Sequence, residues 1–194
     1  MFEKILVAMD KSDLSQCAFE KAVSLAKVLN AKLMLLHVLS SDDEDSPQMN
    51  TLYGEGYYTE LDEILRDRYE REWNEFAHDY LSLLEGWVKQ AVTAGVDAEC
   101  TQPCGNPNRT ICDLAKAWEA DLIVMGSHGR KGFSELLLGS VSNYVMHHAP
   151  CSVLIVHPQE ALRTSTPQKK KAAAVSHQHA SEENIFSGKE SVGH

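Results

Sequence analysis

Short apolar runs alternate with stretches of helical periodicity, and this alternation is the feature that most limits how the chain can fold. The runs are apolar at consecutive positions, as in strands that are buried on both faces of a parallel sheet. The predicted strands are 4–9, 31–39, 96–101, 121–125 and 152–156. The predicted helices are 18–29, 61–94, one that begins at Pro107, and 134–147. Five strands alternating with four helices predict a single α/β domain: an open, doubly wound, five-stranded parallel sheet sandwiched by helices.

Two segments fall outside this alternation. Residues from about 40 to 60 hold an acidic cluster, a proline and two glycines, so we expect a surface loop inserted after the second strand. From residue 159 onward the sequence is rich in Ser, Lys, Glu and His and has little apolar periodicity, which is typical of a disordered tail. The expected organisation is one domain over residues 1–158, with the 40–60 insert, followed by a tail over 159–194.

Composition excludes some classes of function. A formal net charge of −10 argues against a general nucleic-acid-binding protein, which would carry a basic face. No run approaches the ~20 apolar residues of a membrane span, and the opening residues lack the apolar core of a secretory signal. The five cysteines include no Cys-x-x-Cys pair, which favours reduced thiols. We therefore expect a cytoplasmic protein with no nucleic-acid partner and no membrane segment.

Three glycines near the fourth predicted strand raise the question of a phosphate site. Gly126 and Gly129 follow that strand, and Gly139 is followed by Ser140 and Ser142. The glycines could only make turns. Alternatively, they could let backbone N–H groups approach a phosphate, with the two hydroxyls as further donors. The spacing matches neither a Walker A loop nor a Gly-x-Gly-x-x-Gly dinucleotide loop.

The position of these glycines in the predicted sheet favours a ligand. In open α/β sheets, ligands bind beyond the carboxyl ends of the strands, where the strand order reverses. Asp10 follows the first predicted strand, and Gly126 follows the fourth. If the two strands are neighbours with helices leaving to opposite faces, Asp10 and Gly126 face one crevice.

The strand and helix order, the opening ILVAMDKS and the spacing G-x2-G-x9-G-[ST] resemble the universal stress protein family over roughly residues 1–158. The most specific part is GSHGRKGFSELLLGSVSNYVMHHAPCSVLIV. The resemblance implies an adenine nucleotide alpha hydrolase-like fold. In this family the glycine motif marks the members that bind ATP. The resemblance therefore implies that the protein binds ATP, or ADP or AMP, together with Mg²⁺ or Mn²⁺.

The resemblance also assigns roles to single positions. It puts Ala8, Val38 and Met125 around the adenine, and Asp10 beside the ribose and phosphates. It implies that the ribose and phosphates are cradled by Gly126, Gly129, Gly139, Ser140, Val141 and Ser142. Lys11, where the family often has a small or apolar residue, would add positive charge near the phosphates.

The fifth strand bears on assembly. Val153–Val156 is apolar, and an open apolar edge strand is an aggregation hazard. The resemblance implies a homodimer in which the fifth strands of two copies pair. The alternative is that the tail covers this edge.

The sequence holds no convincing catalytic set. His128 and Asp13 are the candidate bases near the expected phosphate position. We expect a nucleotide-binding regulatory module of the stress response. The alternatives are a weak ATPase or autophosphorylating phosphotransferase, and a chaperone-like interaction protein.

Overall fold

The computed structural model describes residues 1–43, 45–48, 59–128 and 138–157, and within them it contains one five-stranded sheet. The strands are β1 (Lys4–Ala8), β2 (Lys32–Leu36), β3 (Ala98–Thr101), β4 (Leu122–Gly126) and β5 (Ser152–Val156). All neighbours pair in parallel, in the order β3-β2-β1-β4-β5. The predicted open, doubly wound parallel sheet is confirmed.

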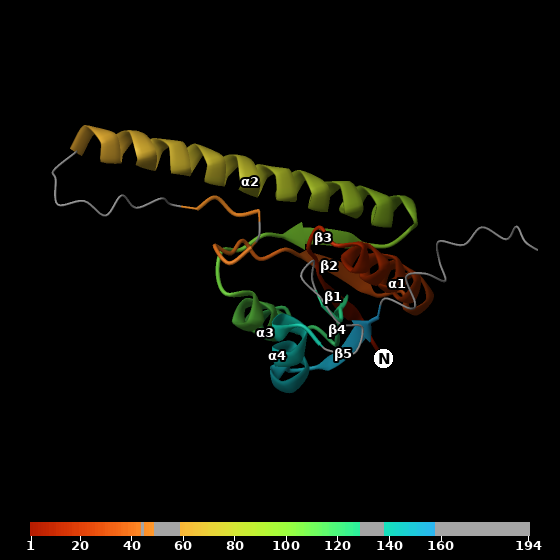
Figure 1. The fold of residues 1–194 in the computed structure, drawn as a ribbon. Coiled ribbons are helices and arrows are strands. Elements are labelled where there is room, and N and C mark those ends of the chain that lie inside the picture. The colour runs from red at the N-terminus through yellow and green to blue at the C-terminus, as the bar shows by residue number, and fades with distance from the viewer. Residues whose placement is uncertain (44, 49–58, 129–137, 158–194) are drawn as a thin grey trace, which may run out of the picture. The chain divides into compact units, whose positions relative to one another are not determined.

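Helices cover both faces of the sheet (Figure 1). They are α1 (Asp13–Leu29), α2 (Thr59–Thr93), α3 (Pro107–Ala117) and α4 (Ser140–His148). Successive strand residues point to opposite faces, so β1 buries Ile5 and Val7 against α1 and α2, and Leu6 against α3 and α4. These three side chains are fully buried, which explains why the run reads as uniformly apolar. None of the helices described here combines the length and the apolar character that crossing a membrane requires.

The strand order reverses between β1 and β4. These two strands are neighbours, with Leu6 opposite Ile123 in the register. The helix that follows β1 packs on one face, and the helix that follows β4 packs on the other. The expected switch point is therefore present, and Asp10 and Gly126 leave the sheet at the same edge.

The starts of the first and last helices differ from the predictions. The predicted last helix starts near Ser134, but Leu138 and Gly139 are not helical and α4 begins at Ser140. Gly139 is extended, with φ −63° and ψ 162°, and its N–H donates to the Ser127 carbonyl at 2.8 Å. That bond fixes the entry to the helix. Helix α1 begins at Asp13, five residues before its apolar periodicity starts, because its first turn is set by a polar cap.

The long helix α2 packs on two separate parts of the domain. Its C-terminal half contributes Leu84 and Ala91 to the core between the sheet and α1. Its middle contributes Phe76 and Tyr80 to a smaller cluster with Leu39, beyond the end of β2. The helix thus reaches the carboxyl edge of the sheet, where the switch point lies.

Candidate functional site

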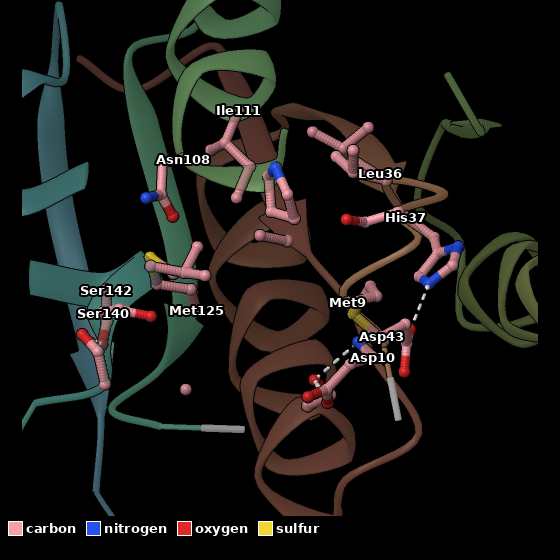
Figure 2. A pocket seen from close by; sticks show the side chains of 18 of the residues that line it. Met9, Asp10, Leu36, His37, Asp43, Asn108, Ile111, Met125, Ser140 and Ser142 are labelled. Carbon is pink, nitrogen blue, oxygen red and sulfur yellow. Dashed lines mark hydrogen bonds and ion pairs between the residues drawn. The ribbon is translucent and has the colours of Figure 1, made fainter. Parts of the chain in front are cut away.

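A cavity of about 550 Å³ opens at this edge of the sheet (Figure 2). That volume is in the range of small-molecule sites. Gly129 lies outside the described residues. The other residues predicted to hold the ligand all line the cavity, namely Ala8, Asp10, Val38, Met125, Gly126, Gly139, Ser140, Val141 and Ser142. The fold therefore brings together positions that are up to 134 residues apart in the sequence, from Ala8 to Ser142.

One part of the cavity is apolar. Ala8 and Met125 come from the ends of β1 and β4, Val38 lies two residues beyond β2, and Ile111 comes from α3. Val38, Met125 and Ile111 are buried members of the core beneath α3 and α4. The core thus continues into the wall of the cavity and offers an apolar surface to a flat ring.

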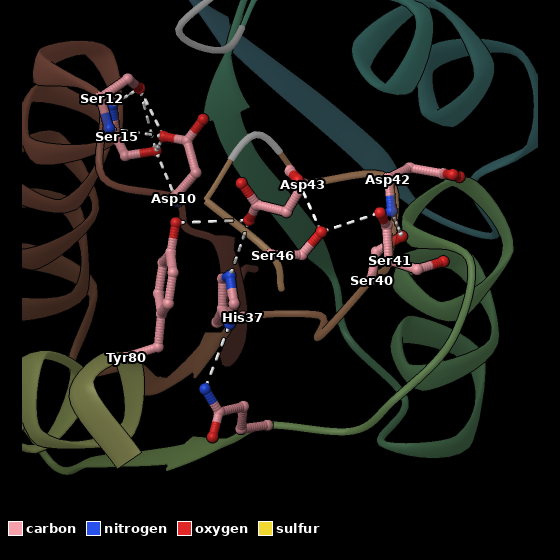
Figure 3. Close-up of polar contacts among 11 residues, drawn as sticks. Asp10, Ser12, Ser15, His37, Ser40, Ser41, Asp42, Asp43, Ser46 and Tyr80 are labelled. Carbon is pink, nitrogen blue, oxygen red and sulfur yellow. Dashed lines mark hydrogen bonds and ion pairs between the residues drawn. The ribbon is translucent and has the colours of Figure 1, made fainter. Parts of the chain in front are cut away.

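A polar loop holds Asp10 at the N-terminus of α1 (Figure 3). Asp10 Oδ1 accepts hydrogen bonds from the Ser12 backbone N–H at 2.9 Å and from the Ser12 and Ser15 hydroxyls. The Asp10 N–H donates to Ser15 Oγ at 2.9 Å. Asp10 Oδ2 has no hydrogen bond to a described residue. The carboxylate is thus fixed in position, with one oxygen available to a ligand.

Helix α4 turns its N-terminus toward the cavity. Gly139 caps it without a side chain, and the Asn143 N–H is the first to bond back, to the Gly139 carbonyl at 2.9 Å. The N–H groups of Ser140, Val141 and Ser142 therefore have no acceptor within the helix. Together with the helix dipole they make a site for an anion.

The two serines of this turn have different roles. The Ser142 side chain is 1% exposed, and its hydroxyl donates to the carbonyls of Ser127 and Gly139. That hydroxyl therefore holds the loop after β4. The prediction from the sequence was that it would donate to a phosphate. Ser140 is exposed, and its hydroxyl has no partner among the described residues.

Two of the glycines are required by the packing of the chain itself. A Cβ on Gly126 would lie 3.1 Å from Leu14 Cβ and 3.3 Å from the His128 carbonyl oxygen. A Cβ on Gly139 would lie 3.2 Å from His128 Cα. Their missing side chains let the loop after β4 lie against α1 and against the start of α4. The same close packing brings the α4 N-terminus to the cavity, so the turn and phosphate explanations do not exclude each other.

Two of the predicted polar neighbours do not line the cavity. Lys11 Nζ sits 4.1 Å from the centre of the Tyr80 ring, a cation–π contact, and Lys11 does not line the cavity. Asp13, one candidate base, is exposed on the first turn of α1 and does not line it either. His128 does line it, with Nδ1 3.0 Å from Ser127 Oγ.

A buried cluster that the sequence analysis missed forms another wall (Figure 3). His37 is 2% exposed and stacks on Tyr80 of α2, with ring centres 3.7 Å apart. Gln102 Nε2 lies 3.2 Å from His37 Nδ1, and because an amide nitrogen only donates, the ring proton lies on Nε2. That atom is 3.7 Å from Asp43 Oδ2, to which the Tyr80 hydroxyl also donates at 3.3 Å. The cluster joins α2 to the segment after β2.

The charges of this cluster are set by its contacts. The nearby His37 ring lowers the pKa of Asp43, against the opposing effect of burial. Burial raises the pKa of Tyr80, and the negative charges of Asp43 and Asp10 raise it further. At neutral pH Asp43 is therefore a carboxylate and Tyr80 a neutral donor. Asp42, which also lines the cavity, adds a third carboxylate to Asp10 and Asp43.

The sequence contained a signal for only part of this wall. His37 interrupts the apolar run 31–39 near its end, and a polar residue at such a position is unusual enough to indicate a special role. Tyr80 belongs to the same aromatic stripe as Trp73 and Phe76, and nothing in the spacing separates it from them. The prediction for segment 40–60 is a surface loop, yet Ser46 is buried, with its hydroxyl donating to backbone carbonyls of the same segment.

Comparison with known proteins identifies the family. Residues 1–157 match the Universal stress protein family. The chain belongs to this family. A universal stress protein of Synechocystis sp. is 38% identical over 155 residues, which cover 80% of this chain and 97% of the relative.

Solved structures of family members share the fold. Universal stress protein UspA from Lactobacillus plantarum matches with a TM-score of 0.62 at 28% identity, over 80% of this chain and 98% of that one. A universal stress protein in complex with cAMP matches with a TM-score of 0.54 at 29% identity, over 80% of this chain and 97% of that one.

Proposed function

We propose that this protein binds an adenine nucleotide in the cavity at the switch point, and that nucleotide occupancy regulates its contacts in the stress response. The observation that carries the proposal is the pairing of an apolar wall with an anion site in one cavity. The base would lie against Val38, Ile111 and Met125, and the phosphates at the N-terminus of α4. The family member solved with cAMP supports the same ligand class.

A divalent cation fits the proposed site only together with phosphate. Among the described residues, no group of three or more His, Cys, Asp or Glu side chains is placed to hold a metal ion. Mg²⁺ is commonly bound by one or two carboxylates and by the phosphates of its nucleotide. Asp10 Oδ2 and Asp43 can supply those carboxylates, so we propose that ATP enters with Mg²⁺ or Mn²⁺.

The first test is the release of bound nucleotide. The protein is purified without added nucleotide and denatured, and the released small molecules are separated by chromatography. We expect a stoichiometric adenine nucleotide. If ATP added to the protein is recovered as ADP faster than in buffer, the protein is instead a weak ATPase. An empty protein that also fails to bind AMP or ATP with Mg²⁺ contradicts the proposal.

A charge substitution tests where the phosphate lies. Ser140→Asp puts a carboxylate on the first turn of α4, where an acid stabilises the helix, so the fold should be kept. We expect about a tenfold loss of AMP affinity by calorimetry, since like charges at this range cost on the order of 1–2 kcal/mol. Binding of adenosine, which has no phosphate, should be unchanged. Asn143→Asp, an exposed position of α4 outside the cavity, is the matched control.

We also propose that two copies pair through β5. Among the described residues this strand lies at the edge of the sheet and pairs with β4 only, and its residues Val153 and Ile155 are half-buried. A lysine on an edge strand opposes edge-to-edge pairing. Light scattering should report a dimer for the wild type and for the control Val28→Lys, an exposed position of α1 away from β5, and a monomer for Val153→Lys. A dimer that survives Val153→Lys contradicts this interface.

The domain boundary is a further part of the proposal. We propose that residues 1–158 form the nucleotide-binding domain and that residues 159–194 are a tail that binding does not need. A chain that ends at Pro158 should therefore bind AMP as tightly as the full chain. A loss of affinity on removing 159–194 would assign the tail a part in the site.

A further inference from the structure

One polar side chain beside the apolar wall of the cavity has no hydrogen-bond partner in the described part of the chain. Asn108 lines the cavity with Ile111 and Met125 (Figure 2). Its side-chain amide makes no hydrogen bond to any described residue. Asn106, the other amide that lines the cavity, uses its Oδ1 to accept the Asn108 N–H at 3.1 Å. Asn108 is thus the lining amide that is left to meet a ligand.

The position of Asn108 is fixed by the start of α3. Pro107 opens the helix, Asn106 caps it, and Asn108 is its second residue. Ile111, three residues later on the same side of the helix, is buried in the core at 3% exposure. Cap and core together hold the backbone, so the Asn108 amide needs only a choice of rotamer to face a base on the apolar wall.

The other polar side chains that line the cavity do not offer the donor and acceptor pair of an amide. Asp10, Asp42 and Asp43 are carboxylates, which only accept hydrogen bonds. Ser140 and His128 lie beside the anion site at α4. Among the described side chains that line the cavity, only an asparagine amide presents one donor and one acceptor side by side.

That pair matches one edge of adenine. Adenine presents an amino donor at N6 beside an acceptor at N7, and asparagine binds this edge with two hydrogen bonds. Guanine presents two acceptors, O6 and N7, on the same edge, so the amide oxygen would face O6 without a proton between them. We propose that Asn108 selects adenine over guanine in this cavity, with Oδ1 accepting from N6 and Nδ2 donating to N7. The inference rests on the proposed nucleotide-binding function.

The test measures AMP and GMP binding by calorimetry to the full-length protein. The variants are Asn108→Ala and the control Arg109→Ala, an exposed neighbour on α3 that does not line the cavity. Neither change touches the Asn106 cap, and circular dichroism checks the fold. We expect Asn108→Ala to weaken AMP about tenfold or more and GMP by less than about twofold, because a bidentate pair gives ~1–3 kcal/mol of discrimination. Arg109→Ala should leave both affinities unchanged.

A change in the ligand tests whether Asn108 binds N7 of adenine. AMP with N7 replaced by carbon should bind the wild type about tenfold more weakly than AMP. It should bind Asn108→Ala as well as AMP does. An equal loss of AMP and GMP in Asn108→Ala, or an unchanged ratio between them, overturns the role of Asn108 while the proposed function stands. A wild type that binds neither nucleotide overturns both.

Discussion

Substituting Gly139 by alanine tests how the loop after β4 and the start of α4 create the anion site. The new Cβ would lie 3.2 Å from His128 Cα and 3.4 Å from His128 Cβ. Unstrained carbon–carbon contacts lie at about 3.5–4.0 Å. The two backbone segments must therefore separate by a few tenths of an ångström. That movement stretches the 2.8 Å bond from the Gly139 N–H to the Ser127 carbonyl.

Two effects of opposite sign set the size of the change. Overpacking of this kind costs typically about 1–3 kcal/mol. Alanine also restricts the unfolded chain, which stabilises by about 0.4–1 kcal/mol where the native backbone suits it. The φ of −63° at Gly139 is such a case. The stretched hydrogen bond loses part of its contribution of roughly 1 kcal/mol. We therefore expect the free energy of unfolding to fall by about 1–2 kcal/mol in total.

Urea denaturation followed by tryptophan fluorescence measures this loss. Gly86→Ala in α2 is the matched control, because its Cβ would have nothing within 4 Å. Because alanine has a better helix propensity than glycine, Gly86→Ala should stabilise the protein by about 0.5–1 kcal/mol. AMP affinity should fall for Gly139→Ala alone. If Gly139→Ala is as stable as Gly86→Ala and binds AMP normally, the close contact with His128 does not shape the site.

Three further substitutions probe the polar contacts around the cavity. Tyr80→Phe keeps the ring but loses the long 3.3 Å bond to the Asp43 carboxylate, so urea denaturation should show a loss of about 1 kcal/mol. The control Tyr69→Phe, on the same helix, should stay within about 0.5 kcal/mol of wild type. Asp43 has a lowered folded-state pKa, so its stabilisation is full above its ordinary pKa of 3.8 and is lost as the pH falls through the lower folded value. Asp43→Asn should lack this part of the acid destabilisation, and a wild-type-like pH profile of unfolding would contradict the pairing with His37. Ser142→Ala should cost about 1 kcal/mol in the same denaturation assay, because the Ser127 carbonyl keeps its other donor, the N–H of residue 139.

The fold was predictable because its signals are local. Buried parallel strands need apolar side chains on both faces, so Ile5, Leu6 and Val7 read directly as a strand. The switch point followed from placing Asp10 and Gly126 after their strands. The start of α4 was not predictable from periodicity, because the leucines before Gly139 continue an apolar pattern and only the bond to the Ser127 carbonyl sets where the helix begins.

The cavity was predictable only on the side that the sheet builds. Tyr80 reaches the cavity because α2 is long enough for its middle to lie at the end of β2. This placement depends on how two segments distant in the sequence align. In sequence Tyr80 is one aromatic of a stripe, and its 3.7 Å stack on His37 depends on a pairing across 43 residues. Asn108 follows a helix cap, where an asparagine also has a purely local explanation. Side chains that serve a site through tertiary alignment leave no periodic trace.

The charges around the cavity decide which form of the nucleotide binds best. Asp10, Asp42 and Asp43 line it, while Lys11, on the same loop as Asp10, has its charge over the Tyr80 ring. Against these carboxylates stands the N-terminus of α4, worth roughly half a positive charge. Each phosphate added to AMP brings more negative charge than this end can offset, so without metal we expect affinity to fall from AMP to ADP to ATP. Mg²⁺ should raise the affinity for ATP most and leave the affinity for AMP nearly unchanged. Calorimetry in EDTA and in Mg²⁺ measures both affinities. Tightest binding of ATP in EDTA would refute this balance.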